Sequence, residues 1–426
     1  MTKETPRKAT VRVRYEKKAK AGKGIKKRSD PAMAEYNEGF TYTDVASGES
    51  DTMSIELADI DLRWAGRWMP RRGDKMEAEI VVGSWGKAGK RRAFQCGRFC
   101  VDEVSYEGPE LTCTVGGVSV PEGNSFRSTG RSKTWKGATL KEIASEIAIR
   151  YHLGLSYTGD AASLGTVEQS DEPDSTFLKK ACEDCGMAIK IYSGGIIIYD
   201  KAVNEALPPA VTLKREDLQK WSYNSTIIGT YTGARIKYTS GKDDKELECV
   251  VGGGKRMLNI NEKVDSLQEA QRKACARVNA ENEKAATMSV TIMADTRVAA
   301  GATVQIQGLC HLSGKYFVDK VTHNIGPDEA YTMTLDLHKC QKRITLAGAG
   351  DAGQGTAGGG FAAGDKVVVD GPAYWGGNGG RANQCSGMEM YITEVLGEGY
   401  KYQYGVAKRA GGTRYGWCGE SSLRKA

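Results

Sequence analysis

Apolar and polar residues alternate strictly in short runs along the first part of this chain. The alternation is clearest in Thr10–Tyr15, Thr52–Leu57 and Met76–Val81, and glycine and proline residues separate such runs. A period of two places every second side chain on the same face of an extended strand, so each run predicts a strand with one buried face. Several short strands at this spacing predict a small barrel or sandwich. We assign residues 1–125 to this domain and expect a β-barrel.

The periodicity changes near residue 135. Thr139 and Glu142 have the spacing of a capping box and precede apolar residues three to four positions apart, which predicts a helix to about His152. A second helix is predicted to begin at Asp174. Its apolar face consists of Leu178, Ala181, Cys182 and Cys185. Strands are predicted at 187–192 and 195–200, so residues 126–204 form an α/β insert domain.

A second β-rich stretch covers residues 205–345 and contains one long helix that is predicted to begin at Ser266 and to end near Lys284. Residues 346–360 are rich in glycine and alanine and have the composition of a flexible linker. Residues 361–426 are few and rich in aromatic side chains, which predicts a small barrel. The expected fold class is mainly β with an α+β insert, in which two small β-barrel domains carry helical insertions and a third barrel follows the linker.

Composition limits the class of protein further. The 53 glycines against 10 prolines indicate many tight turns. The sequence contains no run of about 18 apolar residues, so we expect no membrane-spanning helix. The charged first residues have no apolar stretch behind them, so we expect a chain made in the cytoplasm. Eleven cysteines, an odd count, favour reduced thiols in the core. The net charge of +7 and the basic segment Lys17–Arg28 fit a solvated surface, and contact with DNA is the alternative.

Motifs for catalysis or metal binding are incomplete in this sequence. Cys182 and Cys185 have the spacing of half a zinc site, but no second pair of ligands follows at a fitting distance, so we interpret them as core residues. Gly252–Arg256 resembles a phosphate-binding loop but has Arg256 where Ser or Thr is required, so we predict a glycine hairpin there. We therefore predict no catalytic residues, no cofactor and no metal site, and a protein that is not an enzyme.

Aromatic residues are concentrated near the C-terminus, and four of them are candidates for a binding groove. Tyr374, Trp375, Tyr391 and Trp417 would offer a large rigid contact area for a peptide or a glycan. The alternative is that they form the core of the small barrel.

Several motifs occur in an order that points to a known family. They are Phe40–Asp51, Pro70–Asp74, Cys96–Asp102, Trp135–Leu140 with Ile143, Ala144, Ile147 and Ala148, Gln169–Asp171, Asp174–Leu178 and Val321–His323. In this order, over residues 10–344, they resemble the late control D proteins of P2-like phages and their relatives, the hub proteins of defective phages and R-type bacteriocins.

This resemblance implies a structural role in the baseplate of a contractile tail. Such hubs are homotrimers whose two barrels per subunit form a pseudo-sixfold ring, which adapts the sixfold tail tube to the threefold central spike. The implied partners are further copies of the chain, the tail tube protein, the central spike protein, baseplate wedge proteins and the C-terminus of the tape-measure protein. The implied location is the baseplate of a virion or tail particle that is assembled in the cytoplasm of the bacterial host.

The C-terminal part departs from that family. Residues 361–426 look like an SH3-like module of the kind appended to phage cell-wall enzymes, which implies binding to peptidoglycan or to neighbouring baseplate proteins. The competing interpretation of the whole chain is a cell-wall-binding or cell-wall-degrading tail protein that this module targets.

Overall fold

The computed structural model describes residues 7–16, 32–84, 91–119, 125–239, 246–264, 266–327, 330–345, 364–376, 379–395, 404–409, 415–418 and 422–425. The basic segment Lys17–Arg28 and the predicted linker at 346–360 lie outside the described residues. The chain forms two compact units, Met1–Ala352 and Gly353–Ala426, each of which is treated separately. Strands predominate in both units, which confirms the mainly β architecture. In the part of the chain that is described, no helix has the length and apolar character to cross a membrane.

Twelve strands of the first unit form one large sheet. Along the sheet their order is β1-β4-β5-β6-β3-β2-β19-β20-β17-β13, and β18 pairs with both β19 and β12. Their bounds are β1 Lys8–Glu16, β2 Asn37–Val45, β3 Thr52–Ala58, β4 Lys75–Gly83, β5 Arg91–Glu107, β6 Thr112–Val118, β12 Val211–Lys214, β13 Leu218–Ser225, β17 Ala286–Met293, β18 Thr303–Gln307, β19 Gly314–Ile325 and β20 Thr332–Lys339. The short helices α1 (Ala32–Glu35), η1 (Arg215–Asp217) and η2 (Cys310–Leu312) connect some of these strands.

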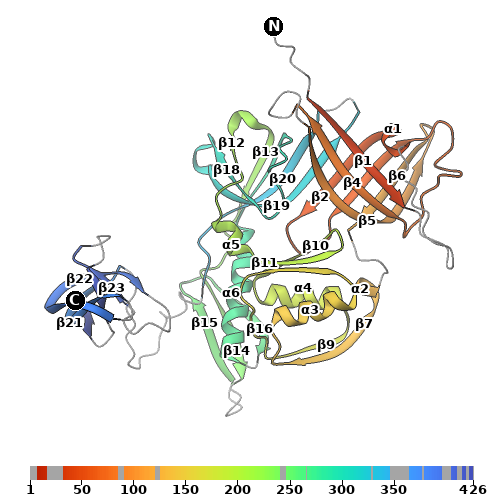
Figure 1. Cartoon of the computed structure of the whole chain (residues 1–426). Helices are drawn as coiled ribbons and strands as arrows, with labels where there is room; N and C mark the ends of the chain where they lie inside the picture. Colours follow the sequence, from red (N-terminus) through yellow and green to blue (C-terminus); the bar gives the residue numbers. More distant parts are fainter. Residues whose placement is uncertain are drawn as a thin grey trace, which may run out of the picture. The chain divides into compact units, whose positions relative to one another are not determined.

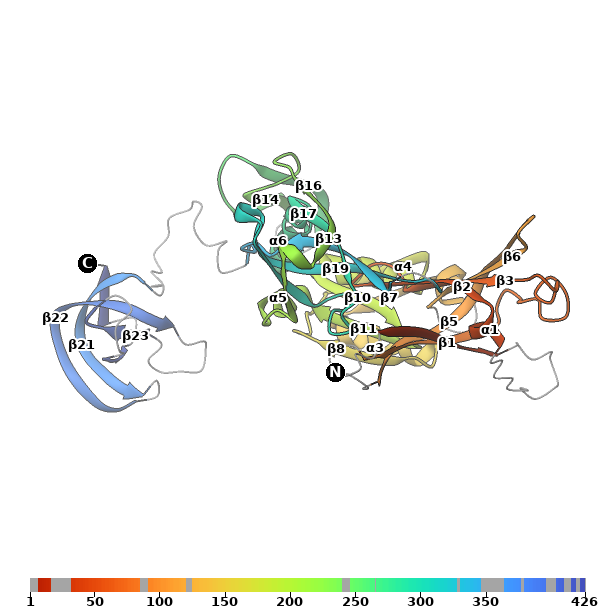
Figure 2. The same cartoon turned by 90° about the horizontal axis from the view of Figure 1, so that it is seen from above.

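The sheet joins two parts of the chain that are far apart in sequence. Six of its strands come from residues 1–125 and six from 205–345, and the antiparallel pairing of β2 with β19 connects the two halves. The halves lie along the unit with β3 and β6 at one end and β13 toward the other (Figures 1 and 2). One continuous apolar core runs beneath both halves. The predicted division into two barrels therefore stays a prediction.

Alternation in the sequence translates directly into burial in this sheet. In β3, Met53, Ile55 and Leu57 are buried while the residues between them are half-buried or exposed. In β17 the same pattern runs through the whole strand. The alternating runs at 10–15, 52–57 and 76–81 are confirmed as strands, and the first two bury one face. In β4 the alternation ends at Ile80, because Val81 is buried as well.

The insert at 126–204 has its own core. It contains α2 (Ser125–Ser128), β7 (Gly130–Lys136), α3 (Leu140–Arg150), β8 (Gly154–Thr158), β9 (Thr166–Pro173), α4 (Asp174–Asp184), β10 (Met187–Tyr192), β11 (Gly195–Asp200) and α5 (Lys201–Ala206). Helices α3 and α4 lie between the sheet β10-β11-β8 and the ribbon β7-β9 (Figure 1). Both predicted helices and both predicted strands are confirmed. The capping box is present, since Thr139 Oγ1 accepts from Glu142 N and Thr139 N donates to Glu142 Oε2 at 2.8 Å.

A second insertion separates β13 from β17. It consists of β14 (Gly233–Thr239), β15 (Glu246–Gly252), β16 (Met257–Val264) and the long helix α6 (Leu267–Glu283), which begins after Ser266 as predicted. The predicted glycine hairpin is wrong, because β15 and β16 pair with opposite edges of β14 and not with each other. Gly252 has a φ of 69°, and a Cβ there would lie 2.5 Å from the carbonyl oxygen of Thr232. The glycine is needed for this close crossing.

The second unit is a small closed barrel. Its strands are β21 (Lys366–Gly376), β22 (Gly379–Val395), β23 (Tyr404–Ala407), β24 (Gly416–Cys418) and β25 (Leu423–Lys425). The order β22-β23-β24-β21 closes through a further pairing of β21 with β22, and β25 pairs with β21. Val367, Met390 and Val406 are among its fully buried residues. A small C-terminal barrel was predicted and is confirmed.

Candidate functional site

The insert domain is fastened to the large sheet by a buried ion pair. Lys190 of β10 reaches into the sheet, where its Nζ lies 3.1 Å from Asp51 Oδ2 and also pairs with Asp44 of β2. Asp44 accepts a hydrogen bond from the Ala300 amide at 2.8 Å, and Asp51 accepts one from the Val45 amide at 3.0 Å. Three segments of the chain therefore meet at two carboxylates, and one ammonium group from the insert balances part of their charge.

The environment of Asp51 changes its acidity. Burial raises the pKa of the Asp51 carboxyl to about 6, Lys190 acts against this rise, and the neighbouring Asp44 adds to it. The Tyr42 hydroxyl donates to Asp51 at 3.0 Å. The ammonium group of Lys190 favours the charged form of Asp51 and so limits the rise that burial causes.

Asp174, from another motif of the resemblance, has the same kind of role inside the insert. Its carboxylate accepts from Gln169 Nε2 at 3.0 Å, from the Tyr151 hydroxyl at 2.7 Å and from Arg150 Nη1 at 2.7 Å. Burial alone would raise the pKa of Asp174, but these hydrogen bonds outweigh it and hold the pKa below its ordinary value. The motif residues Gln169 and Asp174 therefore tie β9 to α3 and α4.

His323, the last residue of the final motif, lies fully buried in β19. Its Nδ1 lies 2.6 Å from the Tyr331 hydroxyl, while its Nε2 has no hydrogen-bond partner among the described residues. Burial lowers the pKa of His323 to about 4, so the ring is neutral at ordinary pH. Its ring packs against Tyr42 and Phe94, which makes it part of the core beside the β2–β19 seam.

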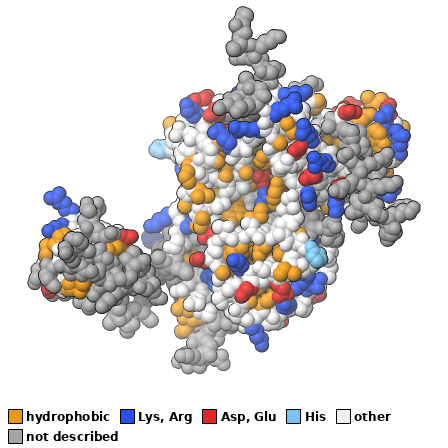
Figure 3. Space-filling model, in the orientation of Figure 1, with side chains coloured by type: hydrophobic (Ala, Val, Ile, Leu, Met, Phe, Trp, Pro, Cys, Tyr) orange, Lys and Arg blue, Asp and Glu red, His pale blue; other side chains and the backbone are white. Residues whose placement is uncertain are grey.

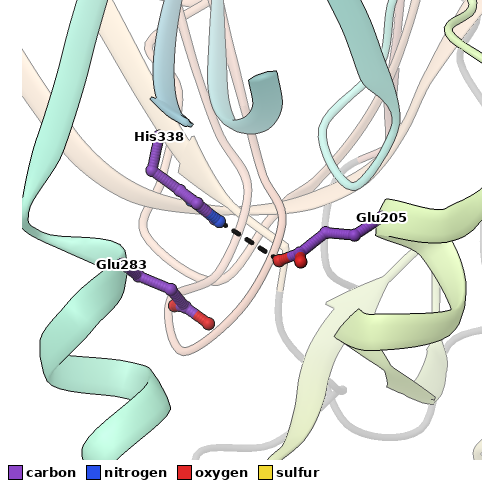
Figure 4. A group of neighbouring side chains, drawn as sticks. All are labelled: Glu205, Glu283 and His338. Carbon is purple, nitrogen blue, oxygen red and sulfur yellow. Dashed lines mark hydrogen bonds and ion pairs between the residues drawn. The ribbon is translucent and has the colours of Figure 1, made fainter. Parts of the chain in front are cut away.

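A second cluster of charges lies where α5, α6 and β20 approach one another (Figure 4). Arg343 donates to Glu205 Oε2 at 3.0 Å and to Glu283 Oε1 at 2.8 Å. His338 lies 3.3 Å from Glu205 through Nε2 and 2.7 Å from Asp319 through Nδ1. Lys201 pairs with Glu283 at 2.8 Å.

The electrostatics of this cluster favour an ion-pair network over a metal site. Glu205, Glu283 and His338 are the group among the described residues whose ligand atoms lie close enough to hold a metal ion. Burial lowers the pKa of His338, but its hydrogen bonds to Asp319 and Glu205 raise it overall to about 9, which makes the ring a cation at neutral pH. Burial would raise the pKa of Glu205, but its contacts with His338 and Arg343 lower it to about 2. With Lys201, three cations face three carboxylates, so the chain neutralises the cluster itself.

The segment that leaves β20 passes over this network. Asn279 of α6 bonds to the backbone of Ile344 twice, accepting from its amide and donating to its carbonyl, each at 2.8 Å. Together with the ion pairs of Arg343, these bonds fix residues 343–344 against α5 and α6.

The four predicted groove residues lie on neighbouring strands of the second unit. Trp417 of β24 is 5% exposed and is paired with Tyr374 of β21 in the ladder, while Tyr391 of β22 and Tyr374 are half-buried. The side chain of Trp375 is outside the described part of the structure. A ligand groove at these residues stays a prediction. Cys182 is buried and Cys185 half-buried, in agreement with the core interpretation of the Cys-x-x-Cys pair.

The sequence contains a signal for the buried carboxylates that Lys190 contacts, although they belong to no catalytic or metal-binding motif. Phe40, Tyr42 and Asp44 occupy alternate positions of β2, and all three are buried. A carboxylate in phase with two aromatic core residues must have a partner in the fold. The identity of that partner, Lys190, depends on the docking of the insert and has no local signal.

Unpaired strand edges are a further feature of the large sheet. Within the described residues, β1, β12 and β13 each pair with a neighbouring strand on one side only. Most of β13 is exposed, including Trp221, which is 43% exposed. An open edge offers unpaired backbone groups to another chain.

Comparisons with known proteins agree with this architecture. A family model described as YQBQ-like matches residues 203–338. The probable baseplate hub protein of Escherichia phage P2 is 29% identical over 216 residues, which are 48% of this chain and 52% of that protein. The probable baseplate hub protein of Escherichia phage 186 is 26% identical over 212 residues, with the same two shares.

The resemblance to the phage baseplate hub proteins is confirmed. The chain matches only about half the length of each of these curated hub proteins. Two solved structures share the fold: the 43 kDa tail protein of prophage MuSo2 from Shewanella oneidensis and the tail protein from Neisseria meningitidis MC58. The Shewanella oneidensis protein aligns with a TM-score of 0.58 and 12% identity, over 78% of this chain and 98% of that protein. The second has a TM-score of 0.56 and 13% identity and covers 78% and 96%.

Proposed function

We propose that the chain is the structural baseplate hub of a contractile phage-type tail and not an enzyme. The observation that carries this proposal is the extended match to two proteins named as probable baseplate hubs. The buried charges support a structural role, because Asp44, Asp51 and Lys190 join parts of the chain to one another. The network around His338 is likewise saturated by partners from the chain itself.

The proposed assembly is a homotrimer. Two six-stranded halves in each subunit would present six similar elements around a threefold axis, which suits an adaptor between a sixfold tube and a threefold spike. The open edges of β1 and β13 lie in different halves of the sheet, so pairing between unlike edges of neighbouring copies would be head-to-tail and would close into a ring.

The further partners follow from this position. The tail tube protein and the central spike protein would bind the two faces of the ring, and wedge proteins its outside. The end of the tape-measure protein would enter from the tube side, and Lys17–Arg28 would be the segment to face DNA in the lumen. The protein would reside in the baseplate after assembly in the bacterial cytoplasm.

Two measurements test the hub role. A cryo-electron microscopy map of purified tail particles should show three copies of the chain on the tail axis, between tube and spike. Sedimentation equilibrium of the purified chain should give three times the mass of the 46.0 kDa subunit. A monomer that is absent from tail particles would refute the proposal.

A pair of variants tests the role of the β13 edge. Trp221→Glu should lower the trimer fraction, because it places a charge on a strand edge that would be covered by the next subunit. Val203→Glu on α5 is the matched control, since Val203 is 46% exposed against 43% for Trp221. Equal trimer fractions in both variants would show that the β13 edge is not the interface.

The closed barrel of the second unit supports a second candidate function, binding to the cell wall. A small barrel that follows the proposed hub region along the chain could bring the tail to peptidoglycan. Cosedimentation of the full chain with purified peptidoglycan, compared with a Tyr374→Ala, Tyr391→Ala variant, tests this role. Release of soluble muropeptides by the full chain would instead support a cell-wall-degrading protein.

A further inference from the structure

The connection between β3 and β4, residues 59–74, exposes an unusual number of apolar side chains. Ile60 is 82% exposed, Leu62 is 55% exposed and Met69 is 51% exposed. Figure 3 shows hydrophobic side chains among charged ones, both basic and acidic, at the end of the first unit that carries α1. Exposed apolar groups that gather in one place, and not singly, mark an interaction site.

The backbone of this loop is held rigidly by Asp59. Its carboxylate accepts from the amides of Trp64 at 3.0 Å and Ala65 at 2.9 Å, and from the Tyr106 hydroxyl at 2.6 Å. The Asp59 amide donates to the Leu111 carbonyl at 2.8 Å, which ties the loop to the start of β6. These bonds fix the position of the exposed tip relative to the sheet.

Aromatic side chains that pack inside the loop add to this rigidity. Trp64 and Trp68 pack edge-to-face on each other, with ring centroids 5.3 Å apart, and both contact Tyr36 at 6.0 Å. Arg63 lies over the Trp68 ring at 5.1 Å and donates to the Tyr36 hydroxyl at 2.8 Å. The two tryptophans therefore support the loop, while the aliphatic side chains face the solvent.

Leu62 at the tip has a strained backbone. Its φ is 55°, in the left-handed region that non-glycine residues seldom occupy. Such strain costs about 1 kcal/mol or more and persists only where the surroundings impose it. The Leu62 amide donates to the Asp59 carbonyl at 2.9 Å, so the turn that Asp59 organises imposes this conformation, while the Leu62 side chain stays 55% exposed.

The exposed charges of this loop are mostly cationic, which indicates the chemistry of a protein that would cover it. Arg67, Arg71 and Arg72 are all exposed in the same loop, and Arg63 pairs with Asp61 at 2.8 Å. An apolar centre with a cationic rim is complementary to an apolar pocket with a carboxylate rim. We propose that residues 59–74 form a preformed docking knob for a different protein, which offers an apolar pocket bordered by Asp or Glu side chains.

A protein fits this surface better than a lipid membrane does. Tryptophan side chains that anchor a protein in a membrane interface point outward, whereas Trp64 is 2% exposed and packs inward. Three aliphatic side chains also bury too little area for stable binding to a bilayer, yet they suffice for a hot spot in a protein pocket. The inference goes beyond the proposed hub function, because it concerns a heterologous partner and does not depend on the symmetry of the ring.

Site-specific photo-cross-linking in living cells tests this proposal. Leu62 is replaced by p-benzoylphenylalanine in the full chain, which is produced in bacteria together with the proteins of its own gene cluster, and cross-linked peptides are identified by mass spectrometry. The same residue at Ile149, 74% exposed on α3, is the matched control. We expect about tenfold more adduct from position 62, joined to one peptide of a different protein that contains Asp or Glu beside apolar residues.

Charge reversal gives the second arm of the test. Arg67→Glu, Arg71→Glu and Arg72→Glu together should lower the yield of that adduct about tenfold, while circular dichroism of the purified variant stays unchanged. Adducts that join only copies of this chain, or a yield no higher than at Ile149, would overturn the proposal. So would flotation of the chain with phosphatidylglycerol vesicles that is lost in the Ile60→Ser, Leu62→Ser variant, since the knob would then bind lipid.

The presence of the chain in purified tail particles is scored separately by immunoblot. A chain that is absent from particles but cross-links through Leu62 refutes the hub role and leaves the docking knob intact. A chain that is present in particles without the adduct refutes the knob alone.

Discussion

Lys190→Met tests how the insert is held on the large sheet. The substitution keeps a long flexible side chain but removes the charge that faces Asp44 and Asp51. The side chains of the two carboxylates are 5% and 0% exposed, so water cannot take the place of the ammonium group. Removal of one partner from a buried ion pair costs about 3–5 kcal/mol, and we expect a loss of this size in the free energy of unfolding at pH 8.

The loss of stability in Lys190→Met should be smaller at low pH than at high pH. Burial already raises the pKa of Asp51 to about 6, and Lys190 opposes the rise. Because the folded pKa exceeds that of an unfolded chain, protonated Asp51 favours the folded state at low pH, and this contribution is lost as pH rises through about 6. Without Lys190 the pKa of Asp51 rises further. The variant should therefore recover much of its stability at pH 5, where the carboxyl takes up a proton.

Urea denaturation of the full chain at pH 5 and pH 8 measures the loss, and hydrogen exchange of β10 and β2 shows where it acts. Lys179→Met on α4 is the matched control, because Lys179 is 45% exposed and lies 3.9 Å from Glu183. An exposed pair of this kind contributes less than about 1 kcal/mol. Equal losses for the two variants at pH 8, or a loss from Lys190→Met that is the same at both values of pH, would refute the reasoning.

Three further predictions follow from the structure. The pKa of His338 is about 9 in the folded protein, so its protonated ring contributes stability that is fully present below pH 6.5 and is lost as pH rises through 9. His338→Asn should therefore flatten the alkaline decline in melting temperature, and an unchanged decline would contradict this reasoning. Gly97→Ala should lower the free energy of unfolding, measured by urea denaturation, by about 1–3 kcal/mol, because φ is 104° and the new Cβ would lie 3.0 Å from the Tyr192 ring. The control Gly137→Ala should lower it less, since φ there is 65° and no atom lies within 4 Å of the new Cβ. Trp417→Ala should unfold the small barrel, because it removes about 3–5 kcal/mol of core packing. Hydrogen exchange would show this as a loss of protection in β21 and β24, whereas Tyr391→Ala should leave that protection in place.

The local elements of this protein follow from its sequence. Alternation at 52–57 predicts β3, and the spacing of Thr139 and Glu142 predicts the start of α3, because both signals depend on residues that are neighbours along the chain. The same holds for Ser266 at the start of α6. The family resemblance also rests on the sequence, through the order of its motifs, and several motif residues, such as Asp51, Gln169 and His323, are buried.

The arrangement of these elements depended on contacts between distant segments. Thr41 and Asn324 bond across the β2–β19 seam although they are 283 positions apart, and no pattern within either strand specifies its partner. The pairing of Lys190 with Asp44 and Asp51 required the insert to dock, and the crossing at Gly252 required β14 to lie between β15 and β16. Periodicity and capping determine which face of a strand or helix is buried, since they act over a few residues. Which surface covers that face is decided by the packing of the whole chain, and only the tertiary structure shows it.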